Sequence, residues 1–545
     1  MSLMPQPKDC PCIWVPGLLE RVAHYAGNDA ACTLRVLNKE AAEWLTNFKV
    51  VRLSLPTPIY AFRQQWNHPD AFRRYTLQER RKLLELTAAS GIIENLKVAR
   101  ANVGLADGLE DMLKAAAAAG QLEMCQLLKE ETSSWGLSLP AASRGGHRHV
   151  CEWMLAAGCP LSSMSAVEGA ARGGHEGLMN WLWEEFLRRG GSTTDSDIEN
   201  LLIAAAEGFD LAALQRLKQH SLPGEDIEGQ QRMVADAITH TTLNRMLAAA
   251  AGSATSDWLA KMEWLEAQGG QPTVQASESA AGSPHDALGR LQWLRSRDYP
   301  LDESVADAAA AAGNPAALQY LVAQMGIRPT AYGITQAFQS GHLAVLQYLH
   351  SVGLLAQYGQ AVENAAINGR LAVVCWVVEA LGLTPDNTAD LLNSAARSGN
   401  TRLMTWLHEW GWSWKSRPAL ENAIKSGCQE AVEWLLGRDC RVPVCGEAYM
   451  VAMGCDDMAM VRFLYRLDVP LGPNLLHSGA VAGGDAFFNL ATVWRSWYSF
   501  VAIEYGGAAS LPVQLQCSGS YGSVYGSNYG SNYGGVGSPT PASLV

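Results

Sequence analysis

The chain has 545 residues, of which 48% are hydrophobic and 17% charged, and its formal net charge is −12. This composition suits a globular chain, and the acidic balance argues against a nucleic-acid partner, because phosphate attraction requires a basic surface. No apolar run is long enough to cross a bilayer, since the nearest approach, residues 487–505, is interrupted by Arg495 and Glu504. We therefore expect neither a nucleic-acid partner nor a membrane.

The N-terminal stretch MSLMPQPKDCPCIW has neither the basic cluster nor the apolar segment of a signal peptide. The twelve cysteines are scattered, and the close pairs Cys10/Cys12 and Cys440/Cys445 lack a second pair at zinc-ligand spacing. We expect free thiols, no metal, no cofactor, and an intracellular, cytoplasmic location.

Residues 1–50 do not follow the pattern of the rest of the chain. Within them, IWVPGLLERVAHYAGNDAACTLRVLNKEAAEW resembles an F-box, with Pro16 before Leu18 and Leu19 and a turn at Asn28. The resemblance implies a helical module whose Pro16, Leu18 and Leu19 dock on a ubiquitin-ligase adaptor. The alternative is an N-terminal cap, since a repeat array must shield the apolar face of its first unit. Both interpretations stay open, and residues 51–80 are expected to form a linker.

From residue 81 to 485 one short sequence motif recurs, as in SGHLAVLQYLHSVGL and SGNTRLMTWLHEWGW. From Trp264 to Phe463 its aromatic residue returns every 27–30 residues, usually seven residues after a Gly. A fixed period of this length indicates a solenoid. The recurring aromatics are Trp153, Trp181, Trp264, Trp293, Tyr320, Tyr348, Trp376, Trp406, Trp434 and Phe463.

Each unit predicts two short helices. The first carries small residues such as Ala-Ala and ends at Gly, which adopts a left-handed conformation without a Cβ clash. The second has apolar residues at helical spacing, as at Val345, Leu346 and Leu349. Because one pair cannot bury its apolar face alone, the units must stack. The predicted fold is all-α, a solenoid of about fourteen stacked helix-turn-helix units that becomes irregular over residues 209–290.

The pattern in AARGGHEGLMNWLWEEF and AFQSGHLAVLQYLHSVGL resembles the ankyrin repeat. That resemblance implies helix pairs with a concave face that holds a protein partner. The period of about 28 residues, against about 33 for ankyrin, and the missing Thr-Pro-Leu-His turn imply shortened or absent hairpin fingers. After the array, residues 486–514 predict a terminal capping helix, and the Gly/Ser/Tyr tract 515–545 predicts a disordered tail.

The recurring aromatics are expected to fill the seam between stacked units, where a large buried side chain contributes about 3–5 kcal/mol relative to Ala. Trp410, Trp412 and Trp414 fall outside this register and are expected to be exposed anchors. The pair His147 and His149 could suggest a metal, but His147 shares its slot with His175 and His342, so a structural role in the turn is predicted.

The sequence lacks the common catalytic and nucleotide-binding motifs. There is no phosphate-binding Gly-Lys-Ser/Thr loop, no dinucleotide fingerprint and no Gly-x-Ser-x-Gly elbow. We predict no catalytic residues and no enzyme, while an enzyme on this frame would require polar groups that converge in a pocket.

In ankyrin-like units the positions just before the glycine that ends each first helix point into the groove, so the resemblance implies that they line the concave face. These positions hold Arg144, Arg172, Gln339, Asn368, Arg397 and Lys425. Four of the six are basic, which favours an acidic partner; alternatively, each cation only complements the helix macrodipole, by about 0.3–1 kcal/mol. The predicted function is a non-enzymatic protein–protein interaction scaffold, and the alternative is a substrate-recognition subunit of an F-box ubiquitin ligase.

Overall fold

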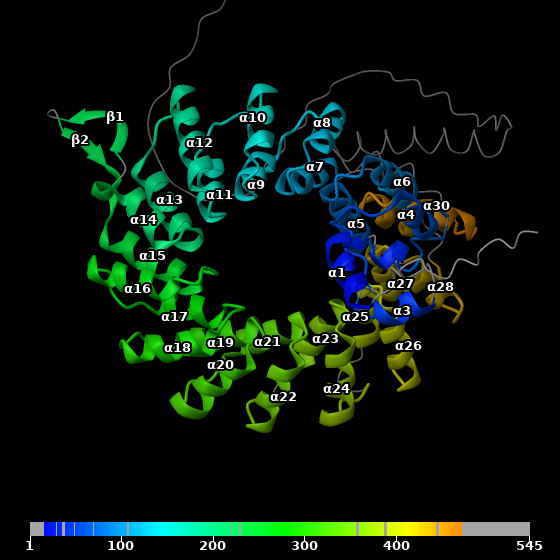
Figure 1. The fold of residues 1–545 in the computed structure, drawn as a ribbon. Helices are drawn as coiled ribbons and strands as arrows, with labels where there is room; N and C mark the ends of the chain where they lie inside the picture. The colour runs from blue at the N-terminus through cyan, green and yellow to red at the C-terminus, as the bar shows by residue number, and fades with distance from the viewer. Residues whose placement is uncertain are drawn as a thin grey trace, which may run out of the picture. The chain divides into compact units, whose positions relative to one another are not determined.

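The computed structural model describes residues 16–470, apart from 29, 35–38, 48–49, 69, 106–107, 220, 228–229, 356–358, 386–387, 389 and 443–445. The predicted capping helix over 486–514 and the tail over 515–545 therefore lie outside the described residues. The helices and strands are shown in Figure 1.

A small helical module begins the described chain. It consists of α1 (Pro16–Ala26), the π-helical turn η1 (Ala30–Leu34) and α3 (Lys39–Trp44). Ala23, Ala41 and Leu45 form its fully buried core. Asn28 ties the module to the next segment, because its Nδ2 donates to Thr57 Oγ1 at 2.9 Å and its Oδ1 accepts from the Arg52 N–H at 2.9 Å.

The segment expected to be a linker contains a packed aromatic cluster. Helix α4 (Ile59–Trp66) buries Phe62 and Trp66. The Trp66 ring stacks on Phe72 with centroids 5.2 Å apart and lies 5.3 Å from Tyr75. This cluster leads directly into the first helix of the array, so residues 59–75 join the module to the array through a small core.

Thirteen helix pairs follow in the part of the chain that the structure describes. The first seven pairs are α5 (Leu77–Ala89) and α6 (Ile93–Val103), α7 (Leu109–Ala118) and α8 (Leu122–Glu131), α9 (Ser138–Arg144) and α10 (Arg148–Ala156), α11 (Ser165–Arg172) and α12 (Glu176–Arg188), α13 (Asp195–Gly208) and α14 (Leu211–Lys218), α15 (His240–Gly252) and α16 (Trp258–Ala267), and α17 (Val274–Ala281) and α18 (Ala287–Ser296). The last six are α19 (Glu303–Ala311) and α20 (Pro315–Gln319) with its π-helical extension η3 (Tyr320–Gln324), α21 (Ala331–Ser340) and α22 (Leu343–Ser351), α23 (Gly359–Ile367) and α24 (Leu371–Leu381), α25 (Leu391–Ser398) and α26 (Thr401–Glu409), α27 (Ser416–Ser426) and α28 (Gln429–Leu436), and α29 (Glu447–Met453) and α30 (Met458–Arg466).

The predicted all-helical solenoid is confirmed, with one small departure. Between α14 and α15 lie two short antiparallel strands, β1 (Ser221–Ile227) and β2 (Gln230–Met233), followed by the 3-10 turn η2 (Val234–Ala237). They fall inside the region 209–290, where the sequence repeat loses its register.

Small residues let the first helices pack side by side. Each first helix contacts the first helix of the next pair from α5 through α27. The alanine pairs predicted to allow this approach are fully buried, for example Ala309 with Ala310 and Ala395 with Ala396. The second helices bury the apolar positions expected from their spacing, including Val345, Leu346 and Leu349.

The recurring Gly and the recurring His are coupled across neighbouring units. Gly146 has φ +77°, and a Cβ placed there would lie 2.5 Å from the His175 ring. Gly313 has φ +73°, and its Cβ would lie 2.3 Å from Nδ1 of His342. The glycine therefore allows the left-handed turn and also leaves room for the imidazole of the next unit.

The residue that follows this glycine turn connects consecutive units by a hydrogen bond. We call it the turn donor. It is the N-cap residue of a second helix, and its side-chain nitrogen donates to a carbonyl at or near the end of the first helix in the preceding unit. The turn donors are His147 to Ala118 O (3.0 Å), Asn314 to Ala281 O (2.7 Å), His342 to Ala311 O (3.0 Å), Arg370 to Gln339 O (2.9 Å) and Asn400 to Gly369 O (3.2 Å). The predicted structural role of His147 and His342 is thus confirmed.

The prediction that the recurring aromatics fill the core is wrong for most of them. Among the ten positions only Phe463 is buried, and the other nine are half-buried. The buried seam is formed instead by the residue directly after each aromatic, such as Leu349 or Leu407, and by the residue three positions before it, such as Val345 or Leu403. The aromatics cover the outer edge of this seam, where their large rings stay partly in contact with water.

The first helix pair of the array packs against its last two pairs, so the series of first helices is closed. Figure 1 shows α5 beside α27, and these two helices are in contact. Arg80 on α5 is buried and forms an ion pair with the buried Asp457, the N-cap residue of α30, with Nη1 3.0 Å from Oδ1. Arg80 also donates to the carbonyls of Val103 (3.0 Å) and Gly427 (3.1 Å).

Backbone contacts reinforce this closure. The Ala459 N–H donates to Gly104 O at 3.1 Å, and the Glu430 N–H donates to Arg73 O at 3.1 Å. The Arg73 guanidinium pairs with Glu433 on α28. We refer to these interactions, together with the Arg80–Asp457 ion pair, as the closing contacts.

Candidate functional site

The six residues predicted to line a binding face all lie at or near the C-terminal ends of first helices. Arg144, Asn368 and Arg397 are exposed, whereas Arg172, Gln339 and Lys425 are half-buried. No member of this set is buried, while the alanines that precede them in the same helices are. The ends of the first helices therefore carry side chains that are not buried by packing between units.

The hydrogen-bond partners of these six residues differ. Arg172 Nε lies 3.0 Å from Glu207 Oε2 on the next first helix, so its charge is partly neutralised. Asn368 donates to the carbonyl of Asn364 within its own helix, at 2.8 Å. Within the described residues, Arg144, Arg397 and Lys425 form no ion pair with a carboxylate. These three cations remain available to an anion from outside the chain.

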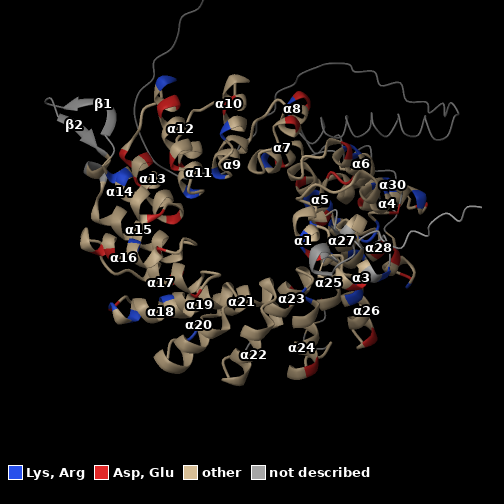
Figure 2. Cartoon of the chain, viewed as in Figure 1, with Lys and Arg blue, Asp and Glu red and all other residues tan. Residues whose placement is uncertain are grey.

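Closure of the array places the four basic positions on one continuous series of first helices. In the sequence, Arg144 and Arg172 are more than two hundred residues from Arg397 and Lys425. In the structure, α27 contacts α5, and α5, α7, α9 and α11 follow one another in contact. The basic residues thus belong to one continuous arc of first helices, from α25 through α5 to α11, on which Figure 2 marks the charged residues.

The structure adds a cation that the sequence pattern did not single out. Arg81 on α5 is exposed, forms no carboxylate ion pair within the described chain, and donates to Cys455 O at 3.4 Å. It comes from the first helix of the array, whereas its neighbours come from the last ones. No sequence signal distinguishes Arg81 from other surface arginines, because its position depends on the closing contacts.

The three tryptophans expected to be exposed anchors behave differently from one another. Trp410 is 50% exposed, as predicted. Trp412 is 2% exposed, and its Nε1 donates to Thr388 O at 3.1 Å, so the prediction is wrong for this residue. Trp414 is half-buried between His408 and Trp434, with ring centroids 5.2 and 5.7 Å away. Of these three tryptophans, Trp410 alone is exposed.

The residues predicted to dock an adaptor lie in the first two turns of α1. Pro16, Leu18 and Leu19 belong to this helix, but their side chains lie outside the described atoms. Further along α1, Val22 is 48% exposed and Tyr25 is 90% exposed. Val22 and Tyr25, three residues apart, lie on the same side of the helix.

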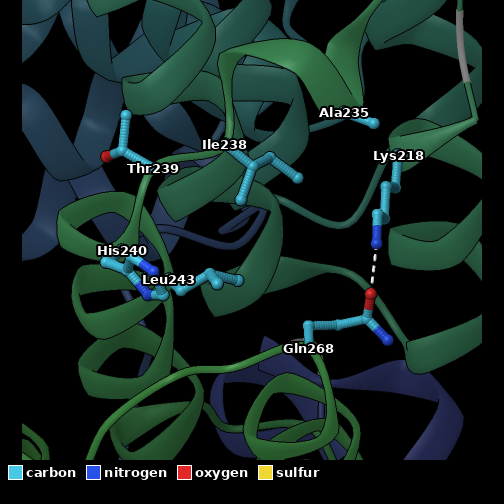
Figure 3. A pocket seen from close by; sticks show the side chains of 7 residues that line it. All are labelled: Lys218, Ala235, Ile238, Thr239, His240, Leu243 and Gln268. Atoms are coloured by element: carbon cyan, nitrogen blue, oxygen red, sulfur yellow. Dashed lines mark hydrogen bonds between the residues drawn. The ribbon is translucent and has the colours of Figure 1, made fainter.

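One open cavity of about 440 Å³ lies between α14, η2, α15 and the turn after α16, and Figure 3 shows its lining. Its polar groups come from Lys218, Thr239, His240 and Gln268, and the Lys218 ammonium is bonded to Gln268 Oε1. Among its described lining residues there is no carboxylate and no nucleophile hydrogen-bonded to a base. The arrangement gives no acid–base pair for catalysis.

No group of three or more His, Cys, Asp or Glu side chains in the described part of the chain is arranged to hold a metal ion. His147 and His149 each bond instead to a backbone carbonyl, and burial lowers the pKa of His147. None of the described helices has the length and apolarity needed to span a membrane.

No protein-family model matches the chain, and no curated protein matches it. Among solved structures, it is similar to the pentatricopeptide repeat protein PPR10 in complex with an 18-nt psaJ RNA element, with TM-score 0.26 and 12% identity over 84% of this chain and 92% of that one. A variant of the same complex with three cysteines replaced gives the same values. The structure of PPR10 from maize gives TM-score 0.22 and 12% identity over 90% of this chain and 89% of that one.

These similarities concern the helical-hairpin arrangement alone, yet they correct one prediction. Net charge was taken to exclude a nucleic-acid partner, but two of the matching helical-repeat structures hold an RNA element. The average charge of a long array does not describe the charge of one of its faces. The exclusion of nucleic acid is therefore contradicted and withdrawn.

Proposed function

We propose that the chain is a non-enzymatic binding scaffold that holds a protein partner on the face formed by the ends of its first helices. The observation that carries this proposal is the contrast within each first helix. The alanines are buried between neighbouring units, whereas the residues just before the turn are exposed or half-buried and chemically varied. Repeat arrays of this kind bind through such extended surfaces. The proposal includes the ankyrin-like character of the units and a cytoplasmic location.

The basic arc suggests how a partner would be oriented. Arg144, Arg397 and Lys425 form no ion pair within the described chain, and Arg172 shares its charge with Glu207. A cation in the last turn of a helix also gains about 0.3–1 kcal/mol from the macrodipole, so its presence alone does not require a partner. The two roles make different predictions for stability and for binding.

The test is charge reversal of all four cations to Glu in the full chain. Proteins captured by the wild-type and variant chains are compared by quantitative mass spectrometry, and melting temperatures are measured in parallel. Selective loss of particular partners with an unchanged melting temperature supports the proposal. A lower melting temperature with unchanged capture would assign these residues to helix stabilisation instead.

A second function, substrate recognition in an F-box ubiquitin ligase, is favoured by the apolar residues that the module leaves in water. Val22, Tyr25 and Val50 are 48%, 90% and 76% exposed. Exposed apolar groups on a module this small are typical of an interaction surface. Leu18→Ala with Leu19→Ala, and separately Val22→Ser with Tyr25→Ser, should abolish capture of the adaptor. If either pair of changes instead unfolds the array, the module acts as a cap.

A further inference from the structure

The closing contacts gather three cations that no carboxylate of the described chain neutralises. Arg81 lies on α5 at the start of the array, whereas Arg397 and Lys425 end α25 and α27 near its other end. Arg81 and Arg397 are exposed and Lys425 is half-buried. We call these three residues the junction cluster.

Local geometry places the three residues around one turn. A Cβ on Gly399, two residues after Arg397, would lie 2.9 Å from Thr76 Cγ2, and a Cβ on Gly427, two residues after Lys425, would lie 2.7 Å from the Leu77 nitrogen. The first turn of α5 therefore abuts both of these glycine turns. Arg81, one turn further along α5, reaches the carbonyl of Cys455 at 3.4 Å.

Electrostatics at Cys455 support the same arrangement. Burial raises the pKa of the Cys455 thiol, and the positive charges of Arg397, Lys425 and Arg81 all oppose this increase. The three cations thus lie within electrostatic reach of a single side chain. They remain only partly screened because they stand at a surface flanked by packed helices.

The nearby carboxylates do not cancel this charge. Asp457 is fully buried, pairs with Arg80 and accepts the Met460 N–H at 3.0 Å, so its oxygens are already engaged. Asp456 is half-buried, and Glu79, which accepts the Thr76 N–H at 2.8 Å in the first turn of α5, is exposed; within the described residues neither forms an ion pair with the three cations. The three cations therefore keep N–H groups available to an external anion.

We propose that closure of the array builds an anion-binding site from Arg81, Arg397 and Lys425, and that this site takes a carboxylate-rich segment of a protein partner. This inference rests on the proposed function and specifies the chemistry of the partner at one place on the face. A run of Asp or Glu offers several carboxylates within a few residues, which suits guanidinium and ammonium groups contributed by three different helices.

An acidic protein segment fits better than a nucleic acid. Single-stranded nucleic acid is held by cations along a strand together with aromatic rings on which bases stack. In the described chain, no large apolar or aromatic residue of α5, α25 or α27 is exposed. The cluster therefore offers charge without a stacking surface.

The test uses the full-length chain and a fluorescein-labelled octaglutamate peptide, followed by fluorescence anisotropy at about 50 mM salt, where surface charges are weakly screened. Replacing Arg81, Arg397 and Lys425 together by Gln should weaken binding about tenfold, because each exposed ion pair contributes a factor of about two to three. The matched control replaces Lys114, Arg295 and Arg328, three exposed cations elsewhere in the array, by Gln and should change binding less than about twofold.

A second variant tests the dependence on closure. Asp457→Asn removes a negative charge, so simple electrostatics predicts tighter binding of octaglutamate. If the site requires closure, loss of the ion pair with Arg80 separates Arg81 from the other two cations and weakens binding instead. Hydrogen exchange at the Ala459 N–H, which donates to Gly104 O, reports whether the array has opened.

Several outcomes would overturn the inference. If the cluster variant and its control lose affinity for octaglutamate equally, the effect comes from the overall charge of the chain and not from this site. Tighter binding by Asp457→Asn while the Ala459 N–H exchanges faster would show that closure does not build the site. Tighter binding of oligouridylate than of octaglutamate, with the same sensitivity to the cluster, would assign the site to nucleic acid. If the wild-type chain captures partners through the ends of its first helices and the cluster variant captures them equally well, only this inference fails. If the wild-type chain captures no partner in this way, the proposed function fails.

Discussion

Two regions of the array join consecutive units by different polar contacts. From α19 to α26 the first helix ends in a short glycine turn, and the turn donors Asn314, His342, Arg370 and Asn400 reach back to the preceding unit. In the pairs α15–α16 and α17–α18 the turns are longer, at residues 253–257 and 282–286. There the donor is a cation placed inside the second helix.

The two internal cations are Lys261 and Arg290, each three residues before the recurring Trp of its unit. Other units bury an apolar residue at that position, such as Val345 or Leu403. Lys261 Nζ donates to Ala206 O (2.7 Å), Phe209 O (2.9 Å) and Ser253 Oγ (2.9 Å). Arg290 donates to Ala251 O (2.6 Å) and Ser253 O (2.8 Å) and lies 4.7 Å from the Trp258 ring.

The difference shows how a repeat tolerates an insertion. In both regions the buried carbonyls at the end of the preceding first helix must find donors, since an unsatisfied buried acceptor costs about 1–3 kcal/mol. At the short turns His342 donates one hydrogen bond and Asn314 two, whereas the longer side chain of Lys261 donates three. The irregular region thus depends on buried charge where the regular region depends on apolar packing.

The largest expected effect is that of Lys261→Met, which keeps the volume but removes the donor. The carbonyls of Ala206 and Phe209 would lose their partner, and we expect unfolding free energy to fall by about 2–4 kcal/mol. Denaturation of the full chain would measure the loss, and hydrogen exchange would locate it to α13–α16. Lys114→Met, at an exposed position, should change stability by less than about 0.5 kcal/mol. A similar cost at both positions would contradict the proposed dependence on Lys261.

The pH dependence of the unfolding free energy, compared between the wild-type chain and Lys261→Met, sharpens the comparison of the two regions. Burial lowers the pKa of Lys261 from its ordinary 10.5 to about 8. Between these values the unfolded chain holds a proton that the folded chain has released, so the folded state gains stability as pH rises. The difference in unfolding free energy between wild type and Lys261→Met should grow by about 2 kcal/mol from about pH 8 to pH 10.

Thiol ionisation acts in the opposite direction but does not affect this difference. Burial raises the pKa of Cys125 and of Cys151 to about 12, so the unfolded chain loses these protons first and both proteins lose stability at high pH. Because the thiols are the same in both proteins, their contribution cancels. A difference that stays constant across this pH range would show that Lys261 is not desolvated.

A smaller effect is expected from His342→Ala in the regular region. The change removes the turn donor to Ala311 O, and water can partly replace it because His342 is only half-buried. We expect a loss of about 1 kcal/mol in unfolding free energy. His342→Asn should restore most of it, since Asn314 and Asn400 fill the same slot in neighbouring units. If Asn gives no rescue, packing against Gly313 and not the hydrogen bond sets the cost.

The repeat could be predicted from the sequence because its signals are local. Helix pairs, glycine turns and the Gly-His spacing all lie within one period, so a single copy shows the contacts that every copy repeats. The exposed ends of the first helices followed from the same register. Irregularity over 209–290 was also visible, although the burial of Lys261 was not, because a lysine in an amphipathic helix ordinarily faces water.

Closure of the array could not be predicted in this way. The Arg80–Asp457 pair joins residues 377 positions apart, and each is an unremarkable charged residue in its own helix. A solenoid pattern specifies how each unit meets the next, and the small rotation between units decides whether the ends meet. That rotation depends on side-chain packing across every interface, so the junction cluster appears only in three dimensions.

The smallest expected effect has the opposite sign and separates the two regions most simply. Tyr348 in the regular region has a buried hydroxyl without a hydrogen-bond partner in the described chain, and burial raises its pKa. Tyr299 in the irregular region donates to Glu266 Oε1 at 2.9 Å. Tyr348→Phe should therefore raise unfolding free energy by about 0.5 kcal/mol, whereas Tyr299→Phe should lower it by about 1–2 kcal/mol. Paired denaturation curves measure both, and equal effects at the two sites would mean that polar networks matter no more in the irregular region than in the regular one.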